Sequence, residues 1–442
     1  MTRTQLTLLC IVSAISTIAV LAGGALSSGP DPALTAALRK QVTYTAQVPA
    51  TAQPAAEADT AVADTTTTDT GADPGAEPVA EPVVSAAEPA AETPTETTPA
   101  AAPTAPAATP APAGTQIEHV FQIVLAGRGY DAAFGAASQA PYLAKELRPQ
   151  GALLTNYRTL GSADLPDHLA FVGGQPPNAD TRANCPSYKE ISPSATPSKS
   201  GEITTAGCVF PNTVITIGDQ LTASARTWRG YIQDLDKGTP PVTACRRPSS
   251  DAADPTLRAR PGDGYATRHN PFVFYHSLLD LGDCDANDGP LERLETDLQA
   301  EKTTPNYAYI APNLCNDGTE APCVDGSAGG LAAADAFLAA WVPKILASPA
   351  YKRNGLIIIT FAGSATGPEP GATAETPVRQ GTLLLSRFAQ AGATEDAAPD
   401  PYSLLRSVQD LFGVKPLARS AKAPSFAGTL LASARLARPG DD

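Results

Sequence analysis

The segment VFQIVLAG, residues 120–127, is an apolar run of strand length that ends in a small residue and a glycine. The segment LIIITFAG, residues 356–363, has the same form. Short apolar runs of this kind are typical of buried strands in parallel sheets, whose two faces are both covered. In open α/β folds the carboxyl ends of the strands carry the reactive groups. Here those ends are Ala126, Gly127, Ala362 and Gly363, which can neither bind a metal nor move a proton.

The rest of the folded part alternates between strand-like and helix-like segments. Further strands are expected at residues 151–157, 227–232, 307–311 and 382–385. Helical spacing of apolar residues marks segments 141–147, 215–225, 330–346 and 401–412, and Asp164 followed by Pro166 is a typical helix start. Alternation of this kind predicts an α/β domain with a mostly parallel sheet covered by helices on both faces.

Composition divides the chain into parts. Residues 48–114 are almost entirely Ala, Pro, Thr, Glu, Asp, Gly and Val, and ten acidic residues occur from Glu57 to Glu96 without a basic one. Such a segment has no core to bury, so we expect residues 27–115 to be a disordered acidic linker. The folded domain then spans residues 116–414. Residues 415–442, rich in Ala with scattered Arg, are expected to be a loosely packed tail.

The amino terminus indicates export. Residues 6–26 are an uncharged, moderately apolar stretch that follows Arg3. The stretch fits a signal peptide and is also just long enough to span a bilayer, so residues 1–26 are a signal peptide or a membrane anchor. Both alternatives predict a secreted or cell-surface protein. Such a protein can be anchored in the membrane through residues 6–26 or associate with the cell envelope.

The net charge of −14 comes in large part from the linker. The folded part is only mildly acidic and has no stripe of Lys and Arg, which argues against a nucleic-acid partner. The sequence names no other partner.

Six cysteines remain when Cys10, inside the amino-terminal stretch, is set aside. An even number in an exported chain indicates disulfides, for which fifteen pairings exist. Short loops close at the lowest entropic cost, so we expect local pairing. The predicted disulfides are Cys185–Cys208, Cys245–Cys284 and Cys315–Cys323.

A series of longer stretches, in a fixed order and spacing, carries a family resemblance. They are APYL (140–143), QGALLTNY (150–157), TIGDQL (216–221), TWRGYIQD (227–234), YATRHNPFVFYHS (265–277), TTPNYAYIAPNLCNDG (303–318), GGLAAADAFLAAWVPKILASPAY (329–351) and YSLLRSVQDLFG (402–413). The chain resembles the phosphoesterase family of bacterial phospholipases C and acid phosphatases. The resemblance implies an alkaline-phosphatase-like fold and metal-dependent hydrolysis of phosphate esters.

Most positions that the resemblance assigns to catalysis are substituted. The family reads ENRSYD and FDE after its two strands, where this chain reads AGRGYD and FAG. The expected nucleophile, a Ser or Thr, is Asp164. The substituted ligand positions are Ala126 and Gly127 for Glu and Asn, Thr319 and Pro401 for two His, and Ala362 and Gly363 for Asp and Glu. Without three or four ligands a divalent ion has no site, so no metal and no other cofactor is expected.

Several polar residues of the implied pocket remain, and two hypotheses follow from them. These residues are Asp131, Asp167, His168, His269, Asn270 and Asp317. Capping of helices and turns explains the aspartates without catalysis. The first hypothesis is therefore an exported homologue that has lost hydrolysis and acts as a binding or surface protein. The second is an active phosphoesterase, dependent on a divalent metal, whose site is rebuilt from six residues: Asp131, Asp164, Asp167, His168, His269 and Asp317.

Overall fold

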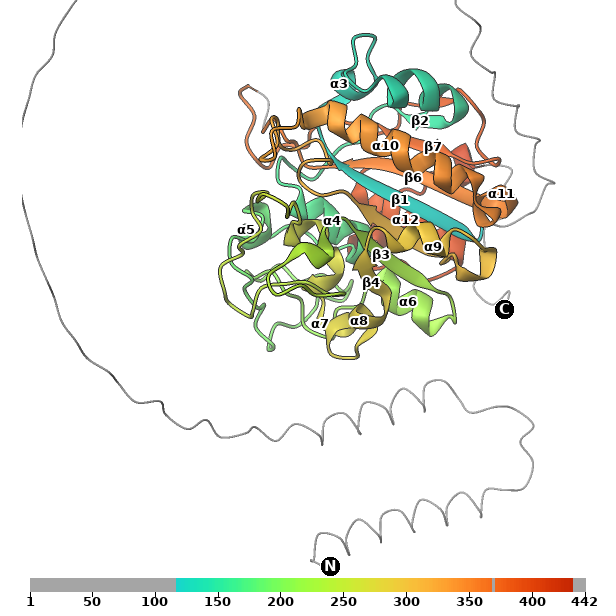
Figure 1. Cartoon of the computed structure of the whole chain (residues 1–442). Coiled ribbons are helices and arrows are strands. Elements are labelled where there is room, and N and C mark those ends of the chain that lie inside the picture. Colours follow the sequence, from blue (N-terminus) through green and yellow to red (C-terminus); the bar gives the residue numbers. More distant parts are fainter. Residues whose placement is uncertain (1–116, 368–369, 432–442) are drawn as a thin grey trace, which may run out of the picture. The chain divides into compact units, whose positions relative to one another are not determined.

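The sheet is assembled around the first apolar segment of the domain. The computed structural model describes residues 117–367 and 370–431, so the predicted residues 1–26 and linker 27–115 lie outside the described residues. The strands are β1 (His119–Ala126), β2 (Ala152–Leu154), β3 (Trp228–Ile232), β4 (Asp288–Pro290), β5 (Tyr307–Ala311), β6 (Gly355–Ala362), β7 (Thr382–Leu385) and β8 (Thr394–Glu395). Their order across the sheet is β4-β3-β5-β1-β6-β7-β2-β8 (Figure 1).

Helical segments connect the strands. The α-helices are α3 (Tyr130–Phe134), α4 (Leu165–Gly173), α5 (Ala179–Arg182), α6 (Ile217–Ala223), α7 (His276–Leu279), α8 (Asp283–Asn287), α9 (Arg293–Asp297), α10 (Gly330–Ala347), α11 (Pro349–Asn354), α12 (Pro401–Phe412) and α13 (Ala427–Leu430). The short 3-10 and π-helical segments are η1 (Tyr142–Leu147), η2 (Arg148–Gln150), η3 (Leu235–Lys237), η4 (Thr267–His269), η5 (Pro271–Phe274), η6 (Glu301–Thr303) and η7 (Ala418–Lys422).

Most neighbouring strands are parallel, which confirms the prediction. β1 pairs with β6 from His119 opposite Gly355 to Ala126 opposite Ala362, and with β5 on its other side. β3 and β4 continue this parallel part. β7 instead runs antiparallel to both β6 and β2, which the alternation of segments does not reveal. Because of this direction, the residues just before β7 lie beside the carboxyl ends of β1 and β6.

Helices cover both faces of the sheet, as predicted. Side chains of β1 alternate between two apolar clusters: Val120 and Val124 belong to one, and Phe121, Ile123 and Leu125 to the other. The first cluster includes buried residues of α4 and α12, and the second includes those of α10. Figure 1 shows α10 in front of the sheet. A strand apolar on both faces therefore lies at the centre of a sheet buried on both faces.

Among the described helices, α10 alone is long and apolar enough to cross a membrane. In this fold it is a core helix, because Leu331, Phe337 and Leu338 pack in the second apolar cluster. Its Asp335 accepts hydrogen bonds from the backbone amides of Tyr142 and Leu143, each at 2.9 Å. These amides begin η1 and have no partner within it, so α10 caps a neighbouring helical segment.

The cysteines pair as loop closure predicts. Disulfides join Cys185 to Cys208, Cys245 to Cys284 and Cys315 to Cys323. None of the six cysteines lies in a strand, so each disulfide holds a connecting segment rather than the sheet.

The packed part of the chain extends beyond residue 414. Phe426, Ala427, Leu430 and Leu431 belong to the apolar cluster that contains α12. The amide of Phe426 also donates a hydrogen bond to Ser407 Oγ at 3.0 Å. The prediction of a loose tail is therefore wrong for residues 415–431. The loose tail was predicted from the Ala-rich composition of this segment. The few apolar side chains that it contains are nevertheless enough to pack it against α12.

Candidate functional site

Ionisable side chains gather at the amino end of α4. Asp164 precedes this helix, and its Oδ1 accepts a hydrogen bond from the amide of Leu165 at 3.0 Å. Its Oδ2 accepts from Arg268 Nε at 2.9 Å and lies 3.1 Å from His269 Nε2. His168, within the first turns of the helix, stacks on His269 with ring centroids 5.1 Å apart. Ligand atoms of Asp164, His168 and His269 all lie within 4.8 Å of one another.

Arg268 balances the charge of Asp164 inside the protein. The two side chains are only 8% and 10% exposed. Burial alone would raise the pKa of Asp164, but the charge of Arg268 and the hydrogen bond with His269 hold this pKa well below its usual value. Burial, with the neighbouring His269, lowers the pKa of His168 well below 6.5. At neutral pH the group therefore contains an ionised Asp164 paired with a guanidinium, beside a neutral His168.

Asp167 connects α4 to the end of β6. Its Oδ1 accepts from the amide of Leu160 at 2.8 Å, and its Oδ2 accepts from the amide of Gly363 at 2.7 Å. Burial raises the pKa of Asp167 well above its usual value, although these two hydrogen bonds oppose the shift. Both oxygens of the Asp167 carboxylate thus accept hydrogen bonds from backbone amides. The carboxylate therefore joins α4 to the end of β6 and is not available to a ligand.

Backbone and a glutamine fill the carboxyl ends of β1 and β6. A Cβ at Gly127 would lie 2.2 Å from the Gly363 carbonyl oxygen and 2.3 Å from Gln380 Nε2. Gly363 has φ +56°, and a Cβ there would lie 2.7 Å from the backbone nitrogen of Asp164. The side chain of Gln380 donates to the Gly363 carbonyl at 3.3 Å and accepts from the Gly129 amide at 2.9 Å. Positions 127 and 363 therefore have no room for the Asn and Glu that the resemblance implies there.

Asp317 lies beside His269, with Oδ2 3.5 Å from His269 Nε2. Its carboxylate also accepts from the backbone amide of Thr319, at 2.6 Å, and from the Thr319 hydroxyl. Burial raises the pKa of Asp317, while His269 and the bonds from Thr319 oppose the shift. The carbonyl of Asp317 accepts from the Ala126 amide at 2.8 Å. Asp317 and Thr319 therefore form a turn that is bonded to the end of β1.

The structure does not bring Asp131 or Asn270 into the implied pocket, contrary to the expectation from sequence. Asp131 is exposed in the first turn of α3, and Gly129 occupies the N-cap position there. Asn270 Nδ2 donates instead to Asp288 Oδ2 at 2.8 Å. Pro401 is the first residue of α12, where it occupies the helix start. Asp131 lies outside the pocket because its position on α3 exposes it to solvent. Asn270 lies outside it because the buried carboxylate of Asp288 accepts its hydrogen bond.

The match to a family is extensive. The model of the Phosphoesterase family matches residues 132–415, which include the sheet from β2 onward and the helices on both its faces. The chain belongs to this family.

Individual relatives of this Phosphoesterase domain are distant. It is 22% identical over 308 residues to an acid phosphatase of Aspergillus fumigatus, covering 69% of this chain and 57% of the relative. It is 26% identical over 205 residues to a probable acid phosphatase of Kluyveromyces lactis, covering 46% of this chain and 39% of the relative. The chain thus spans about half the length of these curated relatives. A solved structure of a protein in the alkaline phosphatase superfamily from Vibrio parahaemolyticus superposes with a TM-score of 0.39 at 14% identity, covering 71% of both chains.

The residues present do not fit the divalent cation that the Phosphoesterase resemblance implies. A metal bound to Asp164 Oδ2 would sit at about 2 Å from that oxygen, while Arg268 Nε already lies 2.9 Å from it. Two positive groups would then compete for one carboxylate. The nearby strand ends offer no replacement ligand, because Ala126, Gly127 and Gly363 carry none.

Three residues at the candidate site were not predicted from the sequence. Arg268 precedes His269 in the family-like stretch, so its place could have been noted, but its pairing with Asp164 spans 104 residues. Tyr309, on β5, bonds through its hydroxyl to His168 Nδ1. Gln380 has no local signal, because its role depends on the direction of β7.

Proposed function

We propose that this chain is an exported member of the Phosphoesterase family that has lost metal-dependent hydrolysis of phosphate esters and acts as a binding or surface protein. The observation that carries the proposal is the packing at the ends of β1 and β6. Gly127 and Gly363 have no space for a Cβ, and Gln380 bonds to the backbone between them. Hydrolysis in this family requires ligands at these positions, so their loss removes the cation as well as its charge.

The electrostatics at Asp164 favour the same conclusion. Metal-assisted phosphoryl transfer depends on positive charge held around the phosphate, and losing several ligands together should remove most of a barrier reduction that normally exceeds ~8 kcal/mol. An ionised Asp164 also adds negative charge at the position of the expected hydroxyl nucleophile. Its pairing with Arg268 leaves no uncompensated positive charge for a phosphate at this carboxylate.

The alternative, an active phosphoesterase with a rebuilt site, has one observation in its favour. Asp164, His168 and His269 present ligand atoms within 4.8 Å of one another, with Asp317 next to them. Binding of a cation there would require Arg268 to leave Asp164. Asp131 would not take part, because it is exposed on α3.

Metal binding and turnover distinguish the two hypotheses. We expect calorimetric titration with Zn²⁺, Mn²⁺, Mg²⁺ or Ca²⁺ to show no stoichiometric binding. We also expect an aryl phosphate monoester and diester to be hydrolysed no faster than without protein. Stoichiometric metal, together with turnover that Asp164→Ala abolishes, would establish the alternative. Asp251→Ala, which removes an exposed aspartate outside the cluster, is the matched control.

Export rests on two features, the apolar amino-terminal stretch and the disulfides of the domain. Disulfides persist in oxidising compartments and are rare in the cytosol. Fractionation of cells that express the full chain, with mass spectrometry of its amino terminus, tests the proposal and separates cleavage from anchoring. A cytosolic protein with six free thiols in the domain would contradict it.

A further inference from the structure

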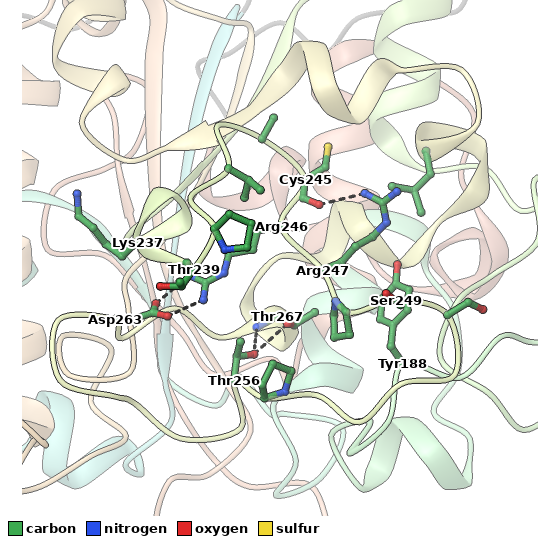
Figure 2. A pocket seen from close by; sticks show the side chains of 18 of the residues that line it. Tyr188, Lys237, Thr239, Cys245, Arg246, Arg247, Ser249, Thr256, Asp263 and Thr267 are labelled. Atoms are coloured by element: carbon green, nitrogen blue, oxygen red, sulfur yellow. Dashed lines mark hydrogen bonds and ion pairs between the residues drawn. The ribbon is translucent and has the colours of Figure 1, made fainter. Parts of the chain in front are cut away.

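A cavity of about 950 Å³ lies outside the Asp164 cluster. Its walls come mainly from residues 237–263 and from α7, with Tyr188 and Glu190 contributed by the segment closed by the Cys185–Cys208 disulfide. Figure 2 shows Arg246 and Arg247 on this wall, with Thr256 and Thr267 below them. Neither Asp164 nor His168 nor His269 lines the cavity. It is therefore a separate feature of the domain.

Each acidic side chain of the cavity contacts a base. Asp263 accepts two hydrogen bonds from Arg246, with Nη1 to Oδ1 at 2.8 Å and Nη2 to Oδ2 at 2.5 Å. Glu190 and Asp280 each lie 2.9 Å from a ring nitrogen of His276. Burial opposes the charged form of His276, but the carboxylates of Asp280 and Glu190 outweigh it and raise the pKa of His276.

Two arginines of the cavity remain without a matching carboxylate. Arg247 donates from Nη1 to the carbonyl of Cys245 at 3.0 Å, as Figure 2 shows, which leaves its charge uncompensated. Within residues 117–367 and 370–431, neither Arg247 nor Arg260 forms an ion pair. Arg260 lies near Asp263, but Arg246 already holds both oxygens of that carboxylate. The cavity therefore carries an excess of positive charge on a domain that is acidic as a whole.

The backbone of the cavity wall is constrained. Pro240, Pro248, Pro255 and Pro261 line it, and each fixes one backbone dihedral. The Cys245–Cys284 disulfide ties the residue beside Arg246 and Arg247 to α8. Arg246 itself stacks over the ring of Tyr265, with its guanidinium carbon 4.6 Å from the ring centroid. A wall that is ordered before binding lowers the entropic cost of binding.

We propose that this cavity binds an oxyanion ligand, a phosphorylated or carboxylated small molecule, through Arg247 and Arg260. Guanidinium groups match the geometry of phosphate and carboxylate, and the hydroxyls of Thr239 and Ser249 add donors on the same wall. The volume is that of a site for a sugar-sized or larger molecule rather than a single ion. The inference does not depend on the proposed loss of catalysis, because anion binding to the cavity can be measured whether or not the protein hydrolyses phosphate esters.

Calorimetric titration of the full chain at low ionic strength tests the proposal. The probes are inorganic phosphate, glucose 6-phosphate and glucuronate, with glucose as the neutral comparison. We expect glucose 6-phosphate or glucuronate to bind and glucose not to bind. The set of anions that bind shows whether the site recognises free phosphate, a phosphate ester or a carboxylate.

Variants locate the binding. Arg247→Gln together with Arg260→Gln should weaken it by at least about tenfold, and both residues are exposed, so the fold should persist. Arg258→Gln removes one positive charge from an exposed residue of the same segment that does not line the cavity, and should leave affinity within about twofold. The proposal is overturned if none of the three anions binds, or if Arg258→Gln weakens binding as much as the double substitution.

Discussion

The backbone amide of Gly363 donates a hydrogen bond to Asp167 Oδ2 at 2.7 Å, which joins the end of β6 to α4. Next to this bond the backbones of residues 363 and 164 are in direct contact, because Gly363 has no side chain between them. The place where the resemblance implies a metal ligand is thus a close contact between backbones.

We predict that Gly363→Ala destabilises the domain by at least about 2 kcal/mol, since it combines strain at positive φ with a clash against backbone. Gly127→Ala should do the same, because its Cβ would meet the Gly363 carbonyl. Gly428→Ala is the control, since a Cβ there has open space. Urea unfolding measures all three. Equal stability of Gly363→Ala and the unmodified protein would show that the strand ends have room.

Replacing Arg268 with Met should cost about 3–5 kcal/mol, because it leaves the buried carboxylate of Asp164 without its partner. Adding Asp164→Asn should recover part of the loss. Arg258→Met, at an exposed site, should change stability by no more than about 0.5 kcal/mol. A cost at Arg268 as small as at Arg258 would mean that the ion pair has no net effect.

The sign of the pH effect at Asp164 follows from its lowered pKa. The ionised form is favoured in the folded state, so its contribution to stability is present above the unfolded pKa of about 3.8 and is lost as the pH falls through the lower folded pKa. In Arg268→Met the pKa should rise. Unfolding curves measured below pH 5 should therefore show that Arg268→Met loses stability at a higher pH than the unmodified protein does.

Asp288 should have the opposite pH dependence. Burial raises its pKa to about 7, although hydrogen bonds from Asn270 and Cys245 oppose the shift. The folded state then holds a proton that the unfolded state releases, so stability should fall by about 1.4 kcal/mol per pH unit from about pH 4 to pH 7. Asp288→Asn should remove this slope, and Asp251→Asn, at an exposed site, should keep it. An identical slope in Asp288→Asn would place the pKa of Asp288 near its ordinary value.

The disulfides should differ in their effect on stability. Cys245 and Cys284 are 39 residues apart, whereas Cys315 and Cys323 are 8 apart. Loop-closure entropy then predicts a loss of about 4 kcal/mol when the first pair is replaced by Ala and about 2.5 kcal/mol for the second. Chemical unfolding of the two double variants checks the order. A larger loss for the shorter loop would show that native contacts, not chain entropy, decide.

Local sequence patterns predicted the helices and strands well, but they did not predict the contacts between distant segments. The apolar runs mark β1, β6 and β7, and α12 begins and ends where its periodicity indicates. The cap at Asp164 was also visible, because capping depends on neighbouring residues. The antiparallel direction of β7 is set by tertiary structure, and with it the place of Gln380. Pairing of Arg268 with Asp164 likewise joins segments that no local pattern connects.

The strand at the centre of the sheet is made first, and its partner along its whole length is made much later. β1 begins at His119, but His119 pairs with Gly355, so the hydrogen bonds on that side cannot form before about three quarters of the domain has been synthesised. Pairing between distant segments makes folding slow and leaves apolar strands exposed meanwhile. For a chain that crosses a membrane as an unfolded polymer, this order is an advantage. For the exported protein proposed above, the amino-terminal half cannot complete its sheet before β6 has been made. Under that proposal we expect the domain to reach its native state only on the far side of the membrane.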